Sequence, residues 1–273
     1  MSKFKNTFDL SGQVAFVTGG AGILGTRFCH GLAEFGANIA VVDLNAEAAN
    51  DLADELSAEY KTEVVGIGCD VSDPSSVHDA VSKTVDQFGK IDILHNNAAG
   101  HTPDLKSYFA PFEDYSLEDW RKEMSINVDG VFLVAQAVGK QMCQQESGGS
   151  IVQTASIYGV VAPDQRIYEG AEYMGVNINT PASYATSKAA VIGLTKYLST
   201  YWSKYKIRVN TLTPGGVASG QNEEFTAKYS ARVPLGRMAE RDEMVGAFLF
   251  LASNASSYVT GQNMIVDGGL TVW

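Results

Sequence analysis

Short apolar runs alternate with segments of helical periodicity along most of this 273-residue sequence. The runs are apolar throughout, which is typical of strands that are buried on both faces. We expect strands at 14–17, 39–42, 64–69, 91–95, 150–154, 207–212 and 264–266, and helices at 23–35, 45–59, 74–88, 117–142 and 183–203. This alternation predicts an α/β fold, a doubly wound parallel sheet of seven strands with helices on both faces. Ligands of such sheets bind outside the carboxyl ends of the strands.

The composition is that of an ordinary globular protein, with 45% hydrophobic and 19% charged residues. Nothing resembles a linker, a repeat or a low-complexity tract, so we interpret residues 1–273 as one domain. The formal net charge of −11 argues against a nucleic-acid partner, because binding to phosphates needs a basic face.

The sequence favours neither a metal centre nor a membrane anchor. Cys29, Cys69 and Cys143 lie far apart and show no C-x-x-C spacing, so we expect no metal, no disulfide framework and a reducing compartment. Residues 1–13 lack the apolar core of a signal peptide, and no apolar run reaches the length of a membrane span. We therefore expect a cytoplasmic protein that does not bind membranes.

A glycine-rich segment, 18–25 (TGGAGILG), follows the first expected strand and opens the first expected helix. Glycine permits a tight turn and lets the main chain approach a pyrophosphate, and the helix N-terminus adds amide donors and a positive dipole. The alternative is a turn made only for close packing of strand and helix. The strand before it, the helix after it and an acidic residue at the end of the second strand favour a dinucleotide site.

That acidic residue is Asp43, which follows Gly25 by 18 positions (43 − 25). A carboxylate there accepts hydrogen bonds from the adenosine ribose hydroxyls and repels a 2′-phosphate. Its neighbours Leu44 and Asn45 offer no cation for that phosphate. We therefore expect NAD(H) rather than NADP(H). The alternative is that Asp43 caps the next helix.

Several short motifs occur in an order that resembles the classical short-chain dehydrogenase/reductase family, from about residue 10 to 270. Besides the turn, they are Asp70-Val71, 95–99 (HNNAA), Asn127, Ser156, Tyr184 and Lys188 in YATSK, 208–210 (RVN), Pro214-Gly215 and 266–269 (VDGG). The resemblance implies a Rossmann domain, a nicotinamide cofactor and oxidation or reduction of a CH–OH group.

Tyr184 and Lys188 are four residues apart, so on a helix they lie on one face. The pKa of a free tyrosine is roughly 10. To lower this pKa to near 7, the surroundings must favour the phenolate by about 4 kcal/mol. One ammonium about 4 Å away supplies about that much at an intermediate dielectric. The resemblance implies that Tyr184 is the general acid/base and that Lys188 lowers its pKa and holds the nicotinamide ribose. It also implies that Ser156 positions the substrate oxygen and Asn127 supports a relay water. The alternative is a surface Tyr/Lys pair.

The remaining cofactor contacts are also implied by the resemblance. Asp70 and Val71 would meet the adenine, Asn97 and Ala98 the ribose, and Val217 the carboxamide. The alternative for 96–97 is a strand-end turn that satisfies its own main chain. The full expected cofactor set is Gly19, Ala21, Gly22, Ile23, Leu24, Gly25, Asp43, Leu44, Asp70, Val71, Asn97, Ala98, Tyr184, Lys188, Pro214, Gly215, Val217 and Ser219.

Two features depart from the family pattern. The usual turn, T-G-x-x-x-G-x-G, has Ile23 at its sixth place here, so we expect a changed turn shape with retained binding. The interval from Ser156 to Tyr184 is 28 residues (184 − 156), about twice the classical one. We interpret 158–181 as an insertion at the substrate side, with Tyr158, Gln165 and Arg166 as candidate substrate contacts beside Ser156 and Tyr184. The alternative is a surface loop or an oligomer contact.

The segment 217–235 follows the Pro-Gly turn, where the family carries a lid, and its polarity disfavours a steroid or fatty-acyl substrate. The pattern most resembles the sugar and polyol members, including gluconate 5-dehydrogenase-type enzymes. We expect hydride transfer between NAD(H) and a secondary alcohol or ketone of a sugar or sugar-acid-like molecule. The alternatives are an NADPH-dependent ketone reductase and a catalytically silent nucleotide-binding or scaffold protein. The resemblance also implies a homotetramer or homodimer.

Overall fold

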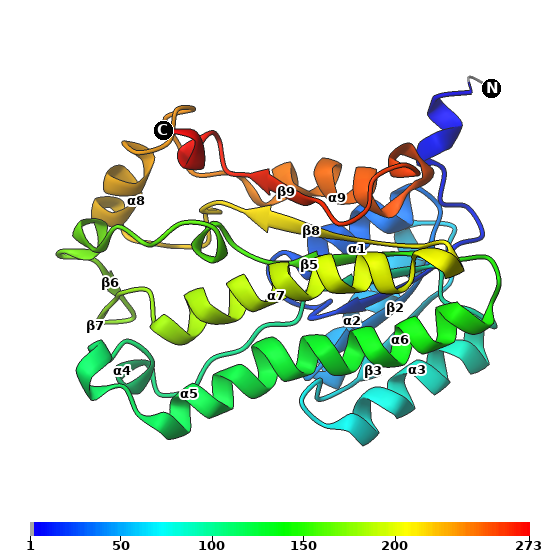
Figure 1. Ribbon diagram of the computed structural model, residues 1–273, viewed down its shortest axis with the longest axis horizontal. Helices are drawn as coiled ribbons and strands as arrows, with labels where there is room; N and C mark the ends of the chain where they lie inside the picture. The colour runs from blue at the N-terminus through cyan, green and yellow to red at the C-terminus, as the bar shows by residue number, and fades with distance from the viewer. Residues whose placement is uncertain (1–2) are drawn as a thin grey trace.

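The computed structural model describes residues 3–273, and in them seven parallel strands form one twisted sheet (Figure 1). The sheet confirms the predicted fold class. The strands are β1 (Val14–Thr18), β2 (Asn38–Asp43), β3 (Val64–Gly68), β4 (Ile93–Asn96), β5 (Gly149–Thr154), β8 (Ile207–Pro214) and β9 (Asn263–Val266).

The strand order is β3-β2-β1-β4-β5-β8-β9, so the direction of winding reverses between β1 and β4. Phe16 of β1 pairs with Ala40 of β2 on one side and with Leu94 of β4 on the other. Every residue of β1 and β4 is buried, including the polar His95 and Asn96 of β4, as expected for central strands covered on both faces. The reversal leaves a crevice at the carboxyl ends of these two strands, where ligands of such sheets bind.

Helices cover both faces of the sheet. One core cluster joins α1, α2 and α9 to β1 and β2, and a second joins α3, α6 and α7 to the opposite face. Alternate β1 residues serve the two clusters, with Val17 in the first and Phe16 in the second. The covering helices are α1 (Gly25–Glu34), α2 (Ala46–Glu59), α3 (Pro74–Phe88), α6 (Val131–Gln144), α7 (Ala182–Tyr201) and α9 (Val245–Ala252).

The predicted helix at 117–142 is three segments. These are α5 (Leu117–Met124), a π-helical stretch (Ser125–Gly130) and α6. A π-helical insertion in an α-helix frequently marks a functional site, and this one carries Asn127. The sequence reasoning also omitted α9, whose residues are apolar on all sides and show no helical periodicity.

Smaller elements gather at the end of the molecule to which the arrowheads of β8 and β9 point (Figure 1). They are α4 (Leu105–Tyr108), the antiparallel hairpin of β6 (Glu172–Tyr173) and β7 (Val176–Asn177), and α8 (Glu223–Ser230). The insertion and α8 share a separate apolar cluster that includes Ile157, Ile167, Phe225 and Tyr229. Within residues 3–273, no helix combines the length and apolar character that crossing a bilayer needs.

Candidate active site

A cavity of about 590 Å³ opens at the carboxyl ends of the strands. Its wall runs from the glycine-rich turn, past the ends of β2, β3 and β4, to the first turns of α7. Predicted site residues that line it are Gly19, Gly22, Ile23, Leu24, Gly25, Asp43, Leu44, Asp70, Val71, Asn97, Ala98, Ser156, Tyr184, Lys188, Pro214, Gly215 and Val217. Residues expected at a dinucleotide site and at a catalytic site thus share one cavity.

The turn between β1 and α1 is closed so tightly that it excludes a side chain at Gly25. A Cβ atom built there would lie 2.0 Å from the carbonyl oxygen of Gly19. Gly19 itself has a φ of +61°, a left-handed conformation that glycine adopts without strain. Ile23, at the sixth place of the motif, is 54% exposed and lines the cavity. The turn therefore presents main chain and an apolar side chain to a ligand.

Asp43 holds this turn against the end of β2. Its Oδ2 accepts a hydrogen bond from the main-chain N–H of Ala21 (3.1 Å), and its Oδ1 accepts one from Asn45 (3.1 Å). The cap of α2 is Asn45, whose side chain accepts from Ala48, so the alternative of Asp43 as the helix cap is wrong. Ala21 contributes its N–H to Asp43 and is not part of the cavity wall.

Thr18 connects the two strands at which the winding reverses. Its hydroxyl oxygen accepts hydrogen bonds from the N–H groups of Asn97 (3.0 Å) and Ala98 (3.1 Å), which follow β4. Asn97 also donates from its side chain to the carbonyls of Thr18 and Gly19, both at 3.3 Å. The contacts of Asn97 thus reach across to the glycine-rich turn, beyond a local strand-end turn.

The catalytic candidates Ser156, Tyr184 and Lys188 meet on the opposite wall of the cavity. Ser156 follows β5 and hydrogen bonds with the phenol of Tyr184 on α7. Lys188, one helical turn beyond Tyr184, is 5% exposed, and its Nζ donates to the carbonyl oxygen of Thr154 (3.1 Å). This Nζ lies 5.7 Å from the centroid of the Tyr184 ring.

Burial has the largest effect on the pKa values of both Tyr184 and Lys188. It raises the pKa of Tyr184, while the hydrogen bond with Ser156 acts in the opposite direction. It lowers the pKa of Lys188 to about 8, because a buried ammonium loses hydration. The resemblance implied that Lys188 lowers the pKa of Tyr184; in the structure the group that acts in this direction is Ser156. The Nζ is directed to Thr154 and itself loses charge near pH 8.

Asn127 is buried below the cavity, in the π-helical stretch. Its side chain forms two hydrogen bonds of 2.9 Å with the main chain of Gly100, donating to the carbonyl and accepting from the N–H. Gly100 lines the cavity, whereas Asn127 does not. Asn127 therefore fixes the loop after β4.

Four further predicted residues lie away from the cavity wall. The Ser219 hydroxyl accepts a hydrogen bond from Gln221, and Tyr158 accepts one from Tyr168 within the insertion. Gln165 faces a neighbouring depression beside Pro111. The Arg166 side chain is 84% exposed and pairs with Asp164, so the structure does not bring it to the cavity.

Sequence reasoning found Asn97 and Ala98 but missed the continuation of the loop after β4 as part of the site. Ala99, Gly100 and His101 line the cavity, as does Ile126 of the π-helical stretch. The His101 ring stacks on Tyr108 of α4, with a centroid separation of 4.6 Å. Gly100 and His101 lie in an irregular segment beyond the 95–99 motif, where neither periodicity nor a motif marks a function.

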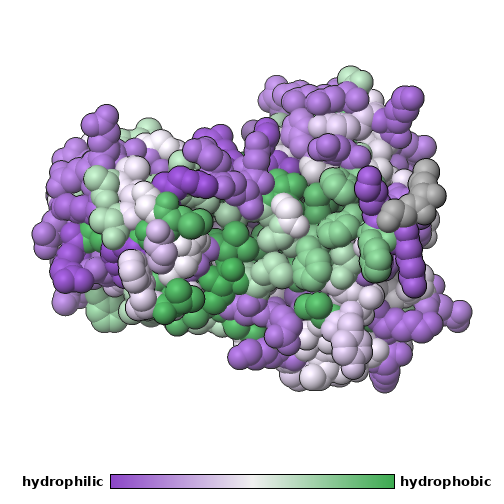
Figure 2. All heavy atoms as spheres, turned by 90° about the horizontal axis from the view of Figure 1, so that it is seen from above, coloured by the Kyte–Doolittle hydropathy of each residue, from purple (hydrophilic) through white to green (hydrophobic). Residues whose placement is uncertain are grey.

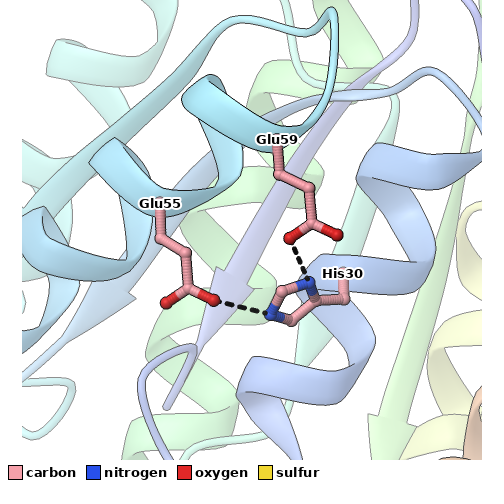
Figure 3. A group of neighbouring side chains, drawn as sticks. All are labelled: His30, Glu55 and Glu59. Atoms are coloured by element: carbon pink, nitrogen blue, oxygen red, sulfur yellow. Dashed lines mark ion pairs between the residues drawn. The ribbon is translucent and has the colours of Figure 1, made fainter.

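A second group of ionisable residues lies on the outer surface between α1 and α2. His30 of α1 points between Glu55 and Glu59 of α2 (Figure 3). Its Nε2 is 3.5 Å from Glu55 and its Nδ1 is 3.8 Å from Glu59, so the two carboxylates face different nitrogens. One ion could not use both nitrogens of a single ring, and we interpret the group as a pair of contacts that link two helices.

The reversal point, the closed glycine turn and a tyrosine–lysine pair in one cavity define a dinucleotide-dependent dehydrogenase. The family model described as enoyl-(acyl carrier protein) reductase matches residues 20–271. The chain is 37% identical to the D-threitol dehydrogenase of Mycolicibacterium smegmatis, over 97% of this chain and 95% of that protein. It is 36% identical to the gluconate 5-dehydrogenase of Gluconobacter oxydans, over 97% of each.

Solved structures of similar sequence have the same fold over nearly the whole chain. A gluconate 5-dehydrogenase from Burkholderia cenocepacia, in complex with NADP and tartrate, superposes with a TM-score of 0.85 at 34% identity, over 98% of each chain. A short-chain dehydrogenase from Leptospira borgpetersenii with bound NAD⁺ has a TM-score of 0.84 at 30% identity, over 99% of this chain and 96% of that one. The chain belongs to the short-chain dehydrogenase/reductase family and is a nicotinamide-dependent oxidoreductase that acts on CH–OH groups.

Proposed function

We propose that this enzyme transfers a hydride between NAD(H) and a secondary alcohol or ketone of a sugar, polyol or sugar-acid-like molecule. The meeting of Ser156, Tyr184 and Lys188 at one end of the dinucleotide cavity carries the proposal. Relatives that act on threitol and gluconate support the substrate class.

In this proposal Tyr184 exchanges a proton with the substrate hydroxyl, and Ser156 orients that oxygen. Lys188 would hold the ribose of a bound cofactor and, when protonated, would favour the phenolate of Tyr184. Asn127 acts through Gly100, because it fixes the loop that borders the reacting groups. The oxidised nicotinamide, when bound, supplies the hydride acceptor and a positive charge.

The preference for NAD(H) rests on Asp43. Its carboxylate lies at the end of β2 on the cavity wall, and the neighbouring Leu44 is exposed and apolar. A 2′-phosphate beside this carboxylate would meet a like charge with no cation in the adjacent sequence to compensate. Dissociation constants for NADH and NADPH, measured by fluorescence titration, test the assignment. Tighter binding of NADPH would overturn it.

The substrate class is tested by following absorbance at 340 nm with NAD⁺ and a panel of sugars, polyols and aldonic acids. We expect turnover of at least one compound with vicinal secondary hydroxyl groups. If the enzyme binds NADH but oxidises none of them, and reduces none of the matching ketoses, the proposed substrate class is wrong.

We further propose a homotetramer or homodimer. Exposed Phe132, Tyr197 and Tyr201 border a groove between α6 and α7. The face that carries α9 and β9 has a continuous apolar area at its centre (Figure 2). Light scattering at micromolar concentration tests the assembly, and a monomer would contradict it.

All three cysteines are free thiols, which suits the reducing cytoplasm that we propose as the compartment.

A further inference from the structure

A fully buried histidine lies behind the cavity wall. His95 of β4 is 0% exposed, and its ring stacks on that of Phe248 in α9, with a centroid separation of 4.2 Å. Phe28 of α1 meets the same ring in a T-shaped contact at 4.5 Å. Burial lowers the pKa of His95 to about 3, so the ring is neutral near pH 7. An apolar side chain would suit these surroundings equally well, and packing alone does not account for an imidazole here.

The His95 ring forms a single hydrogen bond among the described residues, and this bond leads to the cavity. Its Nε2 lies 2.9 Å from the hydroxyl oxygen of Thr154, the last residue of β5. Its Nδ1 is enclosed and has no partner in residues 3–273. Thr154 lines the cavity, whereas His95 does not. His95 therefore contacts the site through Thr154.

The direction of these hydrogen bonds is determined from the far end. Nδ2 of Asn97 donates to the carbonyls of Thr18 and Gly19, so its Oδ1 faces Thr154. An amide oxygen can only accept, and the Thr154 hydroxyl, 3.1 Å away, therefore donates to it. Because a hydroxyl has one proton to give, Nε2 of His95 is the donor toward Thr154. The neutral ring thus carries its proton on Nε2, and the partnerless Nδ1 is the bare nitrogen.

A directed chain of donors consequently runs from the core to the glycine-rich turn. It passes from the His95 ring to the Thr154 hydroxyl, then to the Asn97 amide and the carbonyl of Gly19. The contact at its end is close, since a Cβ atom on Gly19 would lie 2.9 Å from the Cα of Ala98 and 3.4 Å from Nδ2 of Asn97. Without the histidine donor, the Thr154 hydroxyl can rotate away, and the Asn97 amide is no longer held in one orientation.

Thr154 also reaches the catalytic end of the cavity, through its main chain. Its carbonyl oxygen accepts a hydrogen bond from Nζ of Lys188 (3.1 Å). The main chain of Thr154 is paired with Leu212 of β8, so the sheet fixes this carbonyl whatever the side chain does. Loss of the His95 donor should therefore disturb the cofactor turn and leave the partner of Lys188 in place.

We infer that His95 is a positioning residue for the cofactor: its Nε2–H fixes the Thr154 hydroxyl, which holds the Asn97 amide against the glycine-rich turn. His95 acts through these two residues and lies outside the cavity wall. A turn that is ordered before binding costs the ligand no ordering free energy, so the network should contribute to cofactor affinity. This role is independent of the identity of the substrate.

His95→Leu tests this role in the full-length enzyme, because it keeps an apolar side chain beside Phe28 and Phe248 and removes the donor. We expect the Kd of NADH, measured by fluorescence titration, to rise by about tenfold or more. If the native enzyme binds NADPH more tightly, the comparison uses NADPH. With the best substrate of the sugar and polyol panel, kcat at saturating cofactor should fall by less than about threefold. An unchanged Kd, or a loss of kcat as large as the loss of affinity, would overturn the inference.

Two further variants separate the hydrogen bond from packing. His95→Gln retains a side-chain N–H that can donate to Thr154, and its Kd should stay within about threefold of the native value. Thr211→Val on β8 removes a buried hydroxyl that donates to Thr195 (2.7 Å) outside the cavity wall, so it should lower the melting temperature and leave Kd within about twofold. Equal rises of Kd in the Leu and Gln variants would assign the effect to ring shape. A similar rise in Thr211→Val would assign it to loosening of the sheet, and either result would overturn the role of His95.

Thr154→Val tests the same network if His95→Leu does not fold. It removes the hydroxyl from the middle of the chain of donors and leaves the histidine in place. We expect the same rise in Kd as for His95→Leu, and no further rise when both changes are combined, because they break one network. Additive rises would show that His95 and Thr154 act separately, which contradicts the inference.

Discussion

The cofactor end of the cavity and the region beside its substrate end are held in place by different interactions. At the cofactor end, the N–H groups of Ala21 and Asn97 donate to side chains at the ends of β2 and β1, those of Asp43 and Thr18, and Gly25 has no room for a methyl group. Beyond the substrate end and outside the cavity wall, side chains of the insertion pair with each other, as Arg166 does with Asp164. The geometry of the cofactor end is therefore fixed by the sheet, whereas the insertion can change its sequence without disturbing the sheet.

The largest effect should come from the residue that serves both ends. We expect Tyr184→Phe to reduce kcat by about 10³-fold or more, because it removes the proton that general acid/base catalysis transfers. NADH affinity should change little. The control is Tyr197→Phe, an exposed tyrosine on the same helix. Full activity of Tyr184→Phe at 340 nm would refute the catalytic assignment whatever the substrate.

The closed turn should tolerate change least at the cofactor end. A methyl group in Gly25→Ala would lie 2.0 Å from the Gly19 carbonyl, so the turn must move. A displacement of about 1 Å can weaken function by about 10²-fold, and we expect NADH affinity to fall by about that factor. Gly193→Ala on α7, where the added methyl meets open space, is the matched control. Unchanged NADH binding in Gly25→Ala would show that the turn is less constrained than its geometry indicates.

The burial of Lys188 beside Tyr184 should lower the stability of the folded enzyme. Its pKa is about 8 in the folded protein against 10.5 in a free lysine, so the unfolded chain binds more protons between these values. The stability of the native enzyme should therefore rise with pH from about 8 to 10.5.

We expect Lys188→Met to be inactive but more stable by about 2 kcal/mol at pH 7, after the loss of one hydrogen bond to Thr154. Urea unfolding at pH 7 and pH 10 measures the difference, which should shrink at the higher pH. A variant that is less stable than the native enzyme at pH 7 would contradict the direction of the Lys188 pKa.

The smallest effect should come from the insertion's exposed arginine. Arg166→Ala removes a solvated ion pair outside the cavity, so we expect kcat/KM to change by less than about threefold and stability by less than about 1 kcal/mol. A loss of tenfold or more on any substrate would bring Arg166 back into the site. It would also remove the contrast between the two ends.

The parts of the site that could be predicted are those that local spacing or strand order determines. Tyr184 and Lys188 face the same side because they are four apart on a helix, and Asp43 meets the glycine turn because the ends of neighbouring parallel strands coincide. The hydrogen bond from Ser183 to Glu123 joins positions 60 apart through irregular segments, so no pattern in the sequence indicates it. Arg166 pairs with Asp164, two residues earlier, and is exposed. The sequence does not distinguish this carboxylate from a substrate carboxylate as the partner of Arg166.

The separate apolar cluster of the insertion and α8 has a consequence for how the molecule opens. Its members, among them Ile167 and Phe225, belong to neither of the two clusters that pack on the sheet. A cooperative unit with its own small core can unfold locally while the rest of the domain stays intact. Amide hydrogen exchange should therefore divide this chain into two populations, with the amides of 165–178 and of α8 exchanging together and well before those of β1 and β4.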